Sequence, residues 1–240
     1  MEKNIKLLNK DILSKSIAKY RKAINLEDKI IAIELEDNEE FISCVLAAFL
    51  NKCKVLALDI TDSLLRNQAI IDNNNIDLLI TDRNKDEIIF KNIIYNKDIK
   101  EDTFCYEENL SVSDIIISDI VNTKLISKEK IFNKNILKFD GNKAVFVYEN
   151  NKDLYSYIWL LPIINKKELY LSNSTNIDFN DFETVIMPLR LTDKLLSNKN
   201  IKNLKLITYG EELISYSERK EIMNDLNINW VNYYGFPYVT

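Results

Sequence analysis

Residues 28–60 read DKIIAIELEDNEEFISCVLAAFLNKCKVLALDI, and this stretch decides the fold. Two short apolar runs rich in β-branched residues, Lys29–Leu35 and Lys54–Leu58, are predicted strands. Between them, Glu39–Leu50 repeats apolar residues with the spacing of a helix, and Asn38 is its expected N-cap. A strand, a helix and a second strand joined by short connections indicate a parallel sheet.

The same alternation extends outward on both sides of this stretch. It predicts helices at residues 11–25, 62–73, 128–137, 154–164, 189–196 and 211–226, and strands at 77–81, 88–94, 114–118, 144–148, 168–171, 184–187, 204–208 and 229–232. We therefore predict an α/β fold of two stacked subdomains, with mainly parallel sheets covered by helices. Residues 119–127 hold the expected boundary, which gives subdomains at 1–125 and 126–240.

Two absences from the composition exclude common chemistries. The chain has no histidine, so a Ser-His-Asp triad and an imidazole zinc site are both ruled out. It has three glycines in 240 residues, namely Gly141, Gly210 and Gly235. Because a phosphate cradle needs several neighbouring glycines to expose backbone N–H groups, the usual nucleotide-binding loop is missing. We expect no metal site.

The charge and the cysteine content limit which partners and which cellular compartment we expect. With 32 basic and 37 acidic residues the net charge is −5, and no basic run favours nucleic acid as a partner. The cysteines Cys44, Cys53 and Cys105 are odd in number and lack CxxC spacing, which predicts free thiols. No run approaches the ~20 apolar residues of a membrane span, and the first residues do not resemble a signal peptide. We expect a cytoplasmic protein without a membrane partner.

Four segments and one arginine, in this order, resemble a known family. They are residues 28–60, Arg66, DLLITD at 77–82, LITYGEEL at 206–213 and VNYYGFPY at 231–238. The series is similar to an adenylation domain of the adenylate-forming ligase superfamily, closest to the amino-acid-activating domains of nonribosomal peptide synthetases. In that family the last two segments read approximately "GGE-L" and "N-YGPTE". The resemblance implies remnant ligand-binding positions at Gly210, Glu211, Asn232, Tyr234 and Gly235.

The sequence departs from the family pattern at positions that bind ATP and Mg²⁺, the ligands that the resemblance implies. The family's glycine-rich phosphate loop should fall within residues 114–131, where a strand and a helix are expected, but the connection is short and contains no glycine. Tyr238 occupies the position of the family's Mg²⁺-binding glutamate. The family continues with a barrel subdomain and a mobile lysine-bearing domain, both expected to be absent beyond Thr240. We therefore expect no bound cofactor.

Asp153 and the tyrosine pair each allow two interpretations. By resemblance, Asp153 falls where the family's aspartate pairs with the substrate ammonium; alternatively, it is the N-cap of a helix at 154–164. Tyr233 and Tyr234 either stack on a ring or pack against the next helix. Glu211 either faces a cleft or stabilises the first turn of a helix.

Three functions remain open from the sequence. The first is a catalytically inactive adenylation-domain-like protein, which binds a second copy of itself or a peptide-synthetase component, in part through the aromatic region Tyr233–Val239. The second is a fragment of an ATP-dependent ligase that another chain completes. The third is a small-molecule binding module that keeps a remnant acyl pocket around Asp153. By itself the chain is not expected to be an enzyme.

Overall fold

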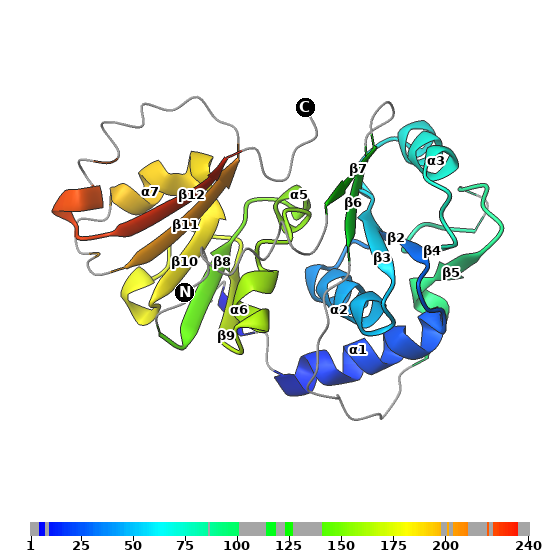
Figure 1. The fold of residues 1–240 in the computed structure, drawn as a ribbon, viewed down its shortest axis with the longest axis horizontal. Coiled ribbons are helices and arrows are strands. Elements are labelled where there is room, and N and C mark those ends of the chain that lie inside the picture. Colours follow the sequence, from blue (N-terminus) through cyan, green and yellow to red (C-terminus); the bar gives the residue numbers. More distant parts are fainter. Residues whose placement is uncertain are drawn as a thin grey trace. The chain divides into compact units, whose positions relative to one another are not determined.

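A computed structural model describes residues 5–7, 10–85, 87–100, 114–118, 123–126, 141–197, 201, 204–210, 220 and 223–234. They form two compact units, each built around one sheet (Figure 1). The N-terminal unit is built from Lys10–Asn133, and the C-terminal unit from Met1–Asn9 together with Lys134–Tyr238. The predicted α/β class, with mainly parallel sheets and flanking helices, is confirmed.

The sheet of the N-terminal unit has the strand order β5-β4-β2-β3-β6-β7. Neighbouring strands are parallel except for β6 and β7, which form an antiparallel pair. Because β3 and β4 lie on opposite sides of β2, the order reverses between β2 and β4. The strands are β2 (Ile30–Glu34), β3 (Lys54–Ala57), β4 (Leu78–Thr81), β5 (Ile93–Tyr95), β6 (Ile115–Ser118) and β7 (Thr123–Ile126).

Three described helices accompany this sheet: α1 (Lys10–Ile24), α2 (Asn38–Leu50) and α3 (Leu64–Asn73). Residues Phe41–Phe49 of α2 are all buried, as expected for a helix with apolar residues around its whole circumference. The N-cap of α2 is Asp37, so the prediction of Asn38 was wrong by one residue. The Asp37 carboxylate accepts the N–H groups of Glu39 and Glu40, both at 2.9 Å, which leaves Asn38 inside the first turn.

A polar cluster joins α1 and α2 to the 3₁₀ helix η1 (Asn96–Asp98) that follows β5. The Asn96 amide donates to Glu40 Oε2 at 2.5 Å, and its carbonyl oxygen accepts the Tyr20 hydroxyl at 2.7 Å. Lys19 Nζ lies 2.9 Å from Glu40 Oε1. Burial by itself would raise the pKa of Glu40, but the hydrogen bonds from Lys19 and Asn96 outweigh it and lower that pKa below its usual 4.5.

We predict that replacing Lys19 makes the stability of the fold less dependent on pH in acid. A carboxylate whose pKa is lowered by folding adds stability above its unfolded pKa, and this stability is lost as pH falls through the folded value. In Lys19→Met the lowering is weakened, so the variant should be less stable than the natural chain at about pH 7 and should lose less stability on acidification. Urea unfolding at several pH values between about 3 and 7 measures this difference. The exposed Lys15 of the same helix provides the control Lys15→Met, and identical pH profiles for the two variants would contradict the prediction.

The C-terminal unit has a sheet of the order β1-β9-β8-β10-β11-β12, parallel except for β1. Here β9 and β10 lie on opposite sides of β8, so the strand order reverses between β8 and β10. The strands are β1 (Ile5–Leu7), β8 (Lys143–Val147), β9 (Glu168–Ser172), β10 (Thr184–Pro188), β11 (Lys205–Gly210) and β12 (Asn229–Tyr234). The short helices are α5 (Asn151–Leu154), α6 (Leu160–Ile164), α7 (Thr192–Leu196), η2 (Phe179–Asp181) and η3 (Leu189–Leu191).

The continuous helix predicted at 154–164 was wrong, because the segment divides into α5 and α6. Tyr157 takes a positive φ of 55°, which a regular helix does not allow. The indole of Trp159 donates to the carbonyl of Leu154 at 2.7 Å and so satisfies an acceptor that a continued helix would have used. Trp159 is fully buried, so tertiary packing of a large side chain replaces helical hydrogen bonding here.

Within residues 114–131 the predicted strand is present as β6, and part of the connection expected after it forms the strand β7. Ser118 pairs with Thr123, so only the four residues 119–122 (DIVN) separate the two strands. The strands β1 and β7 were not predicted, and the predicted division after residue 125 falls within β7. The predicted helix at 128–137 and most of the one at 211–226 lie outside the described residues.

Candidate functional site

Three of the predicted ligand-binding residues meet at the carboxyl ends of neighbouring strands in the C-terminal unit. Gly210 ends β11 and pairs with Tyr234, which ends β12. Asn232 lies two residues earlier on β12 and pairs with Thr208. Carboxyl ends of parallel strands are where open α/β sheets bind ligands. Glu211 and Gly235, the other two residues expected here, lie outside the described residues.

The Asn232 side chain is held along the sheet by its neighbours. Its carbonyl oxygen accepts the hydroxyl of Thr208 at 2.8 Å, and that hydroxyl accepts the indole N–H of Trp230 at 2.9 Å. Thr208 is fully buried. This chain of hydrogen bonds stabilises the pairing of β11 with β12, and it gives Asn232 a structural role that the sequence did not indicate.

Gly210 is required by its backbone conformation rather than by crowding. Its φ of 118° is a backbone angle that residues other than glycine rarely adopt. A Cβ placed there would meet no atom within 4 Å among those that the structure describes. The end of β11 therefore keeps both the glycine conformation and space beside it.

Asp153 binds an arginine of its own chain. It is 1% exposed, and both of its carboxylate oxygens accept from Arg190 Nη2, at 2.8 and 2.7 Å. Its Oδ2 also accepts the backbone N–H groups of Glu149 and Asn150, at 2.7 and 3.3 Å. An ammonium ligand would have to replace Arg190 in this arrangement. Asp153 is the third residue of α5 rather than an N-cap, so the capping alternative was wrong in position.

Arg190 joins the carboxylate after β8 to the segment after β10. Burial opposes its charge, but the hydrogen bonds and negative charge of Asp153 outweigh this effect and raise the pKa of the guanidinium. Its Nε also donates to Glu149 Oε2 at 3.2 Å. Half-exposed Glu149 has its pKa lowered, mainly by that hydrogen bond. The sequence pattern did not point to Arg190; its signal is a charged residue two positions after a buried strand.

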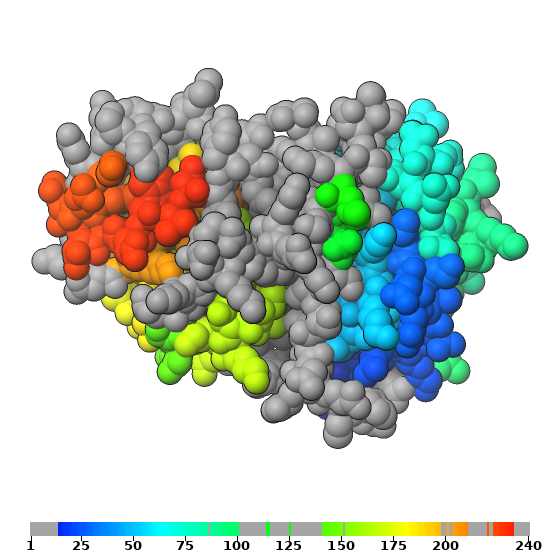
Figure 2. Space-filling view, viewed as in Figure 1, coloured from blue at the N-terminus to red at the C-terminus, as the bar shows by residue number. Residues whose placement is uncertain are grey.

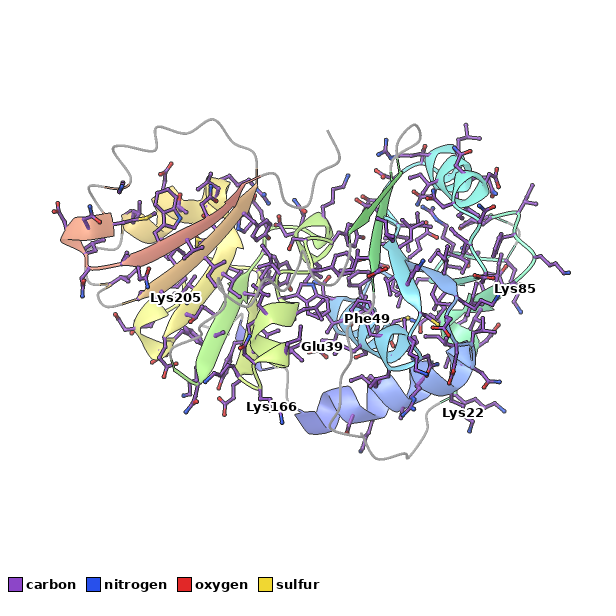
Figure 3. All side chains as sticks on the ribbon, viewed as in Figure 1. Lys22, Glu39, Phe49, Lys85, Lys166 and Lys205 are labelled. Atoms are coloured by element: carbon purple, nitrogen blue, oxygen red, sulfur yellow. The ribbon has the colours of Figure 1, made fainter. Side chains whose placement is uncertain are left out.

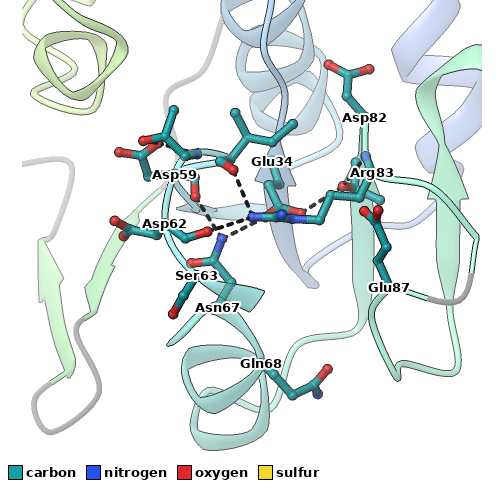
Figure 4. A network of polar contacts seen from close by, with 12 residues as sticks. Glu34, Asp59, Asp62, Ser63, Asn67, Gln68, Asp82, Arg83 and Glu87 are labelled. Carbon is teal, nitrogen blue, oxygen red and sulfur yellow. Dashed lines mark hydrogen bonds and ion pairs between the residues drawn. The ribbon is translucent and has the colours of Figure 1, made fainter. Parts of the chain in front are cut away.

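The N-terminal unit contains a second ion pair at its own reversal of strand order (Figure 4). Glu34, at the end of β2, is fully buried and accepts Arg83 Nε at 2.6 Å. The amide of Asn67 at 2.6 Å and the hydroxyl of Thr81 at 2.7 Å complete the set of donors to this carboxylate. Arg83 also donates through Nη2 to the carbonyls of Ile60 and Asp62, at 2.9 and 3.0 Å.

The two units place these pairs in the same topological position. Arg83 follows the end of β4 by two residues, and Arg190 follows the end of β10 by two residues. Arg83 binds the buried carboxylate of Glu34 on the central strand β2. Arg190 binds that of Asp153, in the segment after the central strand β8. The crevice in which an open α/β sheet usually binds a ligand is therefore occupied in each unit by an internal ion pair.

Thiol and metal chemistry find little support in the described part of the chain. Cys44 and Cys53 are free and buried, and burial raises the pKa of both thiols, which disfavours the nucleophilic thiolate. Cys105 lies outside the described residues. Among the residues that the structure describes, no three Cys, Asp or Glu side chains gather as a metal site would require. None of the described helices is long and apolar enough to cross a membrane.

Comparison with solved structures places this fold in a known class. O-succinylbenzoate coenzyme A synthetase (MenE) from Bacillus subtilis, in complex with AMP, matches 92% of this chain with a TM-score of 0.64 and 14% identity. The four-domain nonribosomal peptide synthetase AB3403, bound to AMP and glycine, matches 93% with a TM-score of 0.70 and 14% identity. The N-terminal subdomain of Klebsiella oxytoca NpsA, in complex with 3-hydroxyanthranilyl-AMSN, matches 94% with a TM-score of 0.64 and 10% identity.

The chain therefore has the fold of the N-terminal part of adenylate-forming enzymes, as the sequence resemblance predicted. It spans 64% of the MenE chain, 64% of the NpsA chain and 19% of the AB3403 chain. No protein-family model and no curated protein matches the sequence. At these identities the likeness concerns the fold alone.

We predict that Arg83→Met lowers the free energy of unfolding by about 3–5 kcal/mol, because it leaves the buried Glu34 carboxylate without its counter-charge. Adding Glu34→Gln to Arg83→Met should restore part of this loss, since the amide needs no counter-charge. Arg66 pairs with Asp62 at 2.9 Å but is 42% exposed, so Arg66→Met should cost at most about 1 kcal/mol. Urea denaturation measures all three variants, and equal losses for Arg83→Met and Arg66→Met would contradict the prediction.

Proposed function

We propose that this protein is a catalytically inactive relative of adenylation domains that acts by binding another protein. The observation that supports this most is the β6–β7 hairpin. Its two strands occupy the segment where the family resemblance places the phosphate loop, and Ser118 pairs directly with Thr123. The four residues between these strands, DIVN, contain no glycine.

A phosphate loop binds through successive backbone N–H groups that converge on the anion, which requires residues at positive φ. Ile120 and Val121 are β-branched and avoid that conformation, and Asp119 adds a negative charge that would repel phosphate. Stabilisation of the charge on a transferring phosphoryl or acyl-phosphate group is usually the largest catalytic contribution. A connection of this length and composition supplies no such stabilisation.

A second candidate function is a ligase fragment that another chain completes. The share of the solved structures that this chain matches favours it, because the chain spans less than two thirds of MenE and of AB3403. A partner chain could supply the remaining domains of such a ligase, but it would not lengthen the β6–β7 connection. A small-molecule binding module is favoured less, because Arg190 already neutralises Asp153.

Calorimetric titration and ATP–pyrophosphate exchange together test the proposed function. We expect no binding heat with ATP–Mg²⁺, no exchange with any amino or aryl acid, and no change when the remnant site is altered by Asp153→Asn. Exchange by the purified chain that rises with ATP concentration would overturn the proposal. Exchange that appears only after a second chain is added would favour the ligase-fragment alternative.

The binding role also predicts a contact at the aromatic carboxyl-terminal region. We propose that Tyr233–Val239 is covered by a second copy of the chain or by a peptide-synthetase component; residues 235–239 lie outside the described part. Sedimentation velocity over a range of concentrations should show self-association, or a complex once the synthetase component is added. Replacing Tyr233 and Tyr234 by serine should weaken the association. A monomer that stays monomeric with every component tested would contradict this contact.

A further inference from the structure

The strand β5 leaves backbone hydrogen-bonding groups at an edge of the N-terminal sheet. β4 is its neighbour among the described strands. The N–H of Leu79 in β4 donates to the carbonyl of Asn92 at 3.0 Å, and Leu79 pairs in register with Ile93. Because successive residues of a strand point in alternate directions, the N–H and C=O groups of Ile93 and Tyr95 point away from β4. These groups are available to an additional strand.

An open groove of about 700 Å³ runs beside this edge. Phe90 and Ile93 pack against the buried core beneath it, and Ile89 is 86% exposed. The segment that forms the groove lies at the surface in Figure 2, around residue 90 in the teal part of the colour bar. The lining residues are Ile88, Ile89, Phe90, Lys91, Ile93 and Tyr95. A hollow with apolar side chains in its lining, next to a sheet edge, gives an added strand an apolar contact.

The exposed position of Ile89 is fixed by the side chain of Gln68 on α3. The Ile89 N–H donates to Gln68 Oε1, and its carbonyl accepts from Gln68 Nε2, both at 3.0 Å. With both backbone groups bound, the residue is held in one conformation before any partner arrives. Such preorganisation reduces the entropy lost on binding. The two hydrogen bonds also explain why the predicted strand at 88–94 begins only at Ile93.

Basic side chains surround the groove in a chain that is acidic overall. Lys91 lines it and is exposed. Lys85, labelled in Figure 3, lies over the ring of Tyr95 at 5.5 Å from the centroid. Exposed Lys97 and Lys100 follow shortly after β5. Arg83 and Lys85 of this segment are paired with Glu34 and Asp98, so the basic charge that faces a partner comes from Lys91, Lys97 and Lys100. The charge near β5 therefore favours an acidic partner.

We propose that the β5 edge binds an extended segment of a partner protein in which apolar and acidic residues alternate. Its backbone would pair with the outward N–H and C=O groups of Ile93 and Tyr95, which is the way that peptides add to an exposed sheet edge. Because side chains of a strand alternate between its two faces, one set of apolar side chains would enter the groove. The acidic set would meet Lys91. This inference rests on the proposed protein-binding role and assigns it a surface.

The test uses the full chain labelled with ¹⁵N and a nine-residue peptide that alternates glutamate with valine or isoleucine. We expect saturable shifts of the amide signals of Ile93, Tyr95 and their neighbours. Lys91→Glu should weaken the affinity about fivefold, the effect of one exposed charge pair. The matched control Lys166→Glu reverses an exposed charge in the other unit and should leave the affinity unchanged. A peptide with a central proline should lose at least about fivefold, because it lacks a backbone donor.

Several results would overturn this inference. Among them are the absence of saturable shifts at about millimolar peptide, shifts confined to other parts of the chain, and equal affinity for a peptide with lysine in place of glutamate. Self-association that Ile89→Ser abolishes without any peptide would assign the groove to a second copy of the chain instead. ATP–pyrophosphate exchange does not depend on this surface, so failure of the peptide test leaves the proposed loss of catalysis standing on its own evidence.

Discussion

A carboxylate that is removed from water must find a counter-charge and hydrogen-bond donors, and each sheet of this protein meets that requirement with one arginine. Glu34 and Asp153 have almost no exposed surface. Arg83 and Arg190 reach them from the segments that follow β4 and β10. Each pair joins the two strands between which the order of the sheet reverses, or the segments that follow them. The packing of the strand ends depends on these contacts.

The same pairs have a consequence for ligand binding. In open α/β sheets the reversal of strand order leaves a crevice at the carboxyl ends, and ligands usually occupy it. Here guanidinium and carboxylate groups fill it. The C-terminal unit nevertheless keeps Gly210 in the conformation that only glycine adopts readily, with space beside it, while Asn232 bonds within the sheet. The fold of adenylate-forming enzymes is thus maintained while the polar groups at its strand ends serve stability.

The edges of the N-terminal sheet differ in the surface that they offer. β7 includes Lys124 and is antiparallel to β6, a common form of sheet edge. β5 is short, yet the segment before it presents Ile89 to solvent with its backbone bound to Gln68. The proposed loss of phosphate chemistry and the proposed docking surface are compatible, because they involve different residues.

The amino-acid sequence by itself determined the fold class, because hydrophobic periodicity is local. The runs KIIAIEL and KVLAL each gave a strand, and the apolar segment between them gave α2. The order of these segments also indicated the likeness that the solved structures show. Gly210, Asn232 and Tyr234 could be placed at strand ends from the sequence, since the strands before them were predicted correctly.

Only the tertiary structure decided which charges pair and where the helices end. Glu34 and Arg83 are separated by 49 positions, and Asp153 and Arg190 by 37, so no local pattern relates them. The break at Tyr157 follows from the burial of Trp159, whose indole replaces a helical donor to Leu154. Periodicity cannot reveal such a replacement, because the periodicity of a helix describes contacts three or four residues apart. Long-range pairing of buried polar groups is set by the packed core, and that core exists only once the strands have come together.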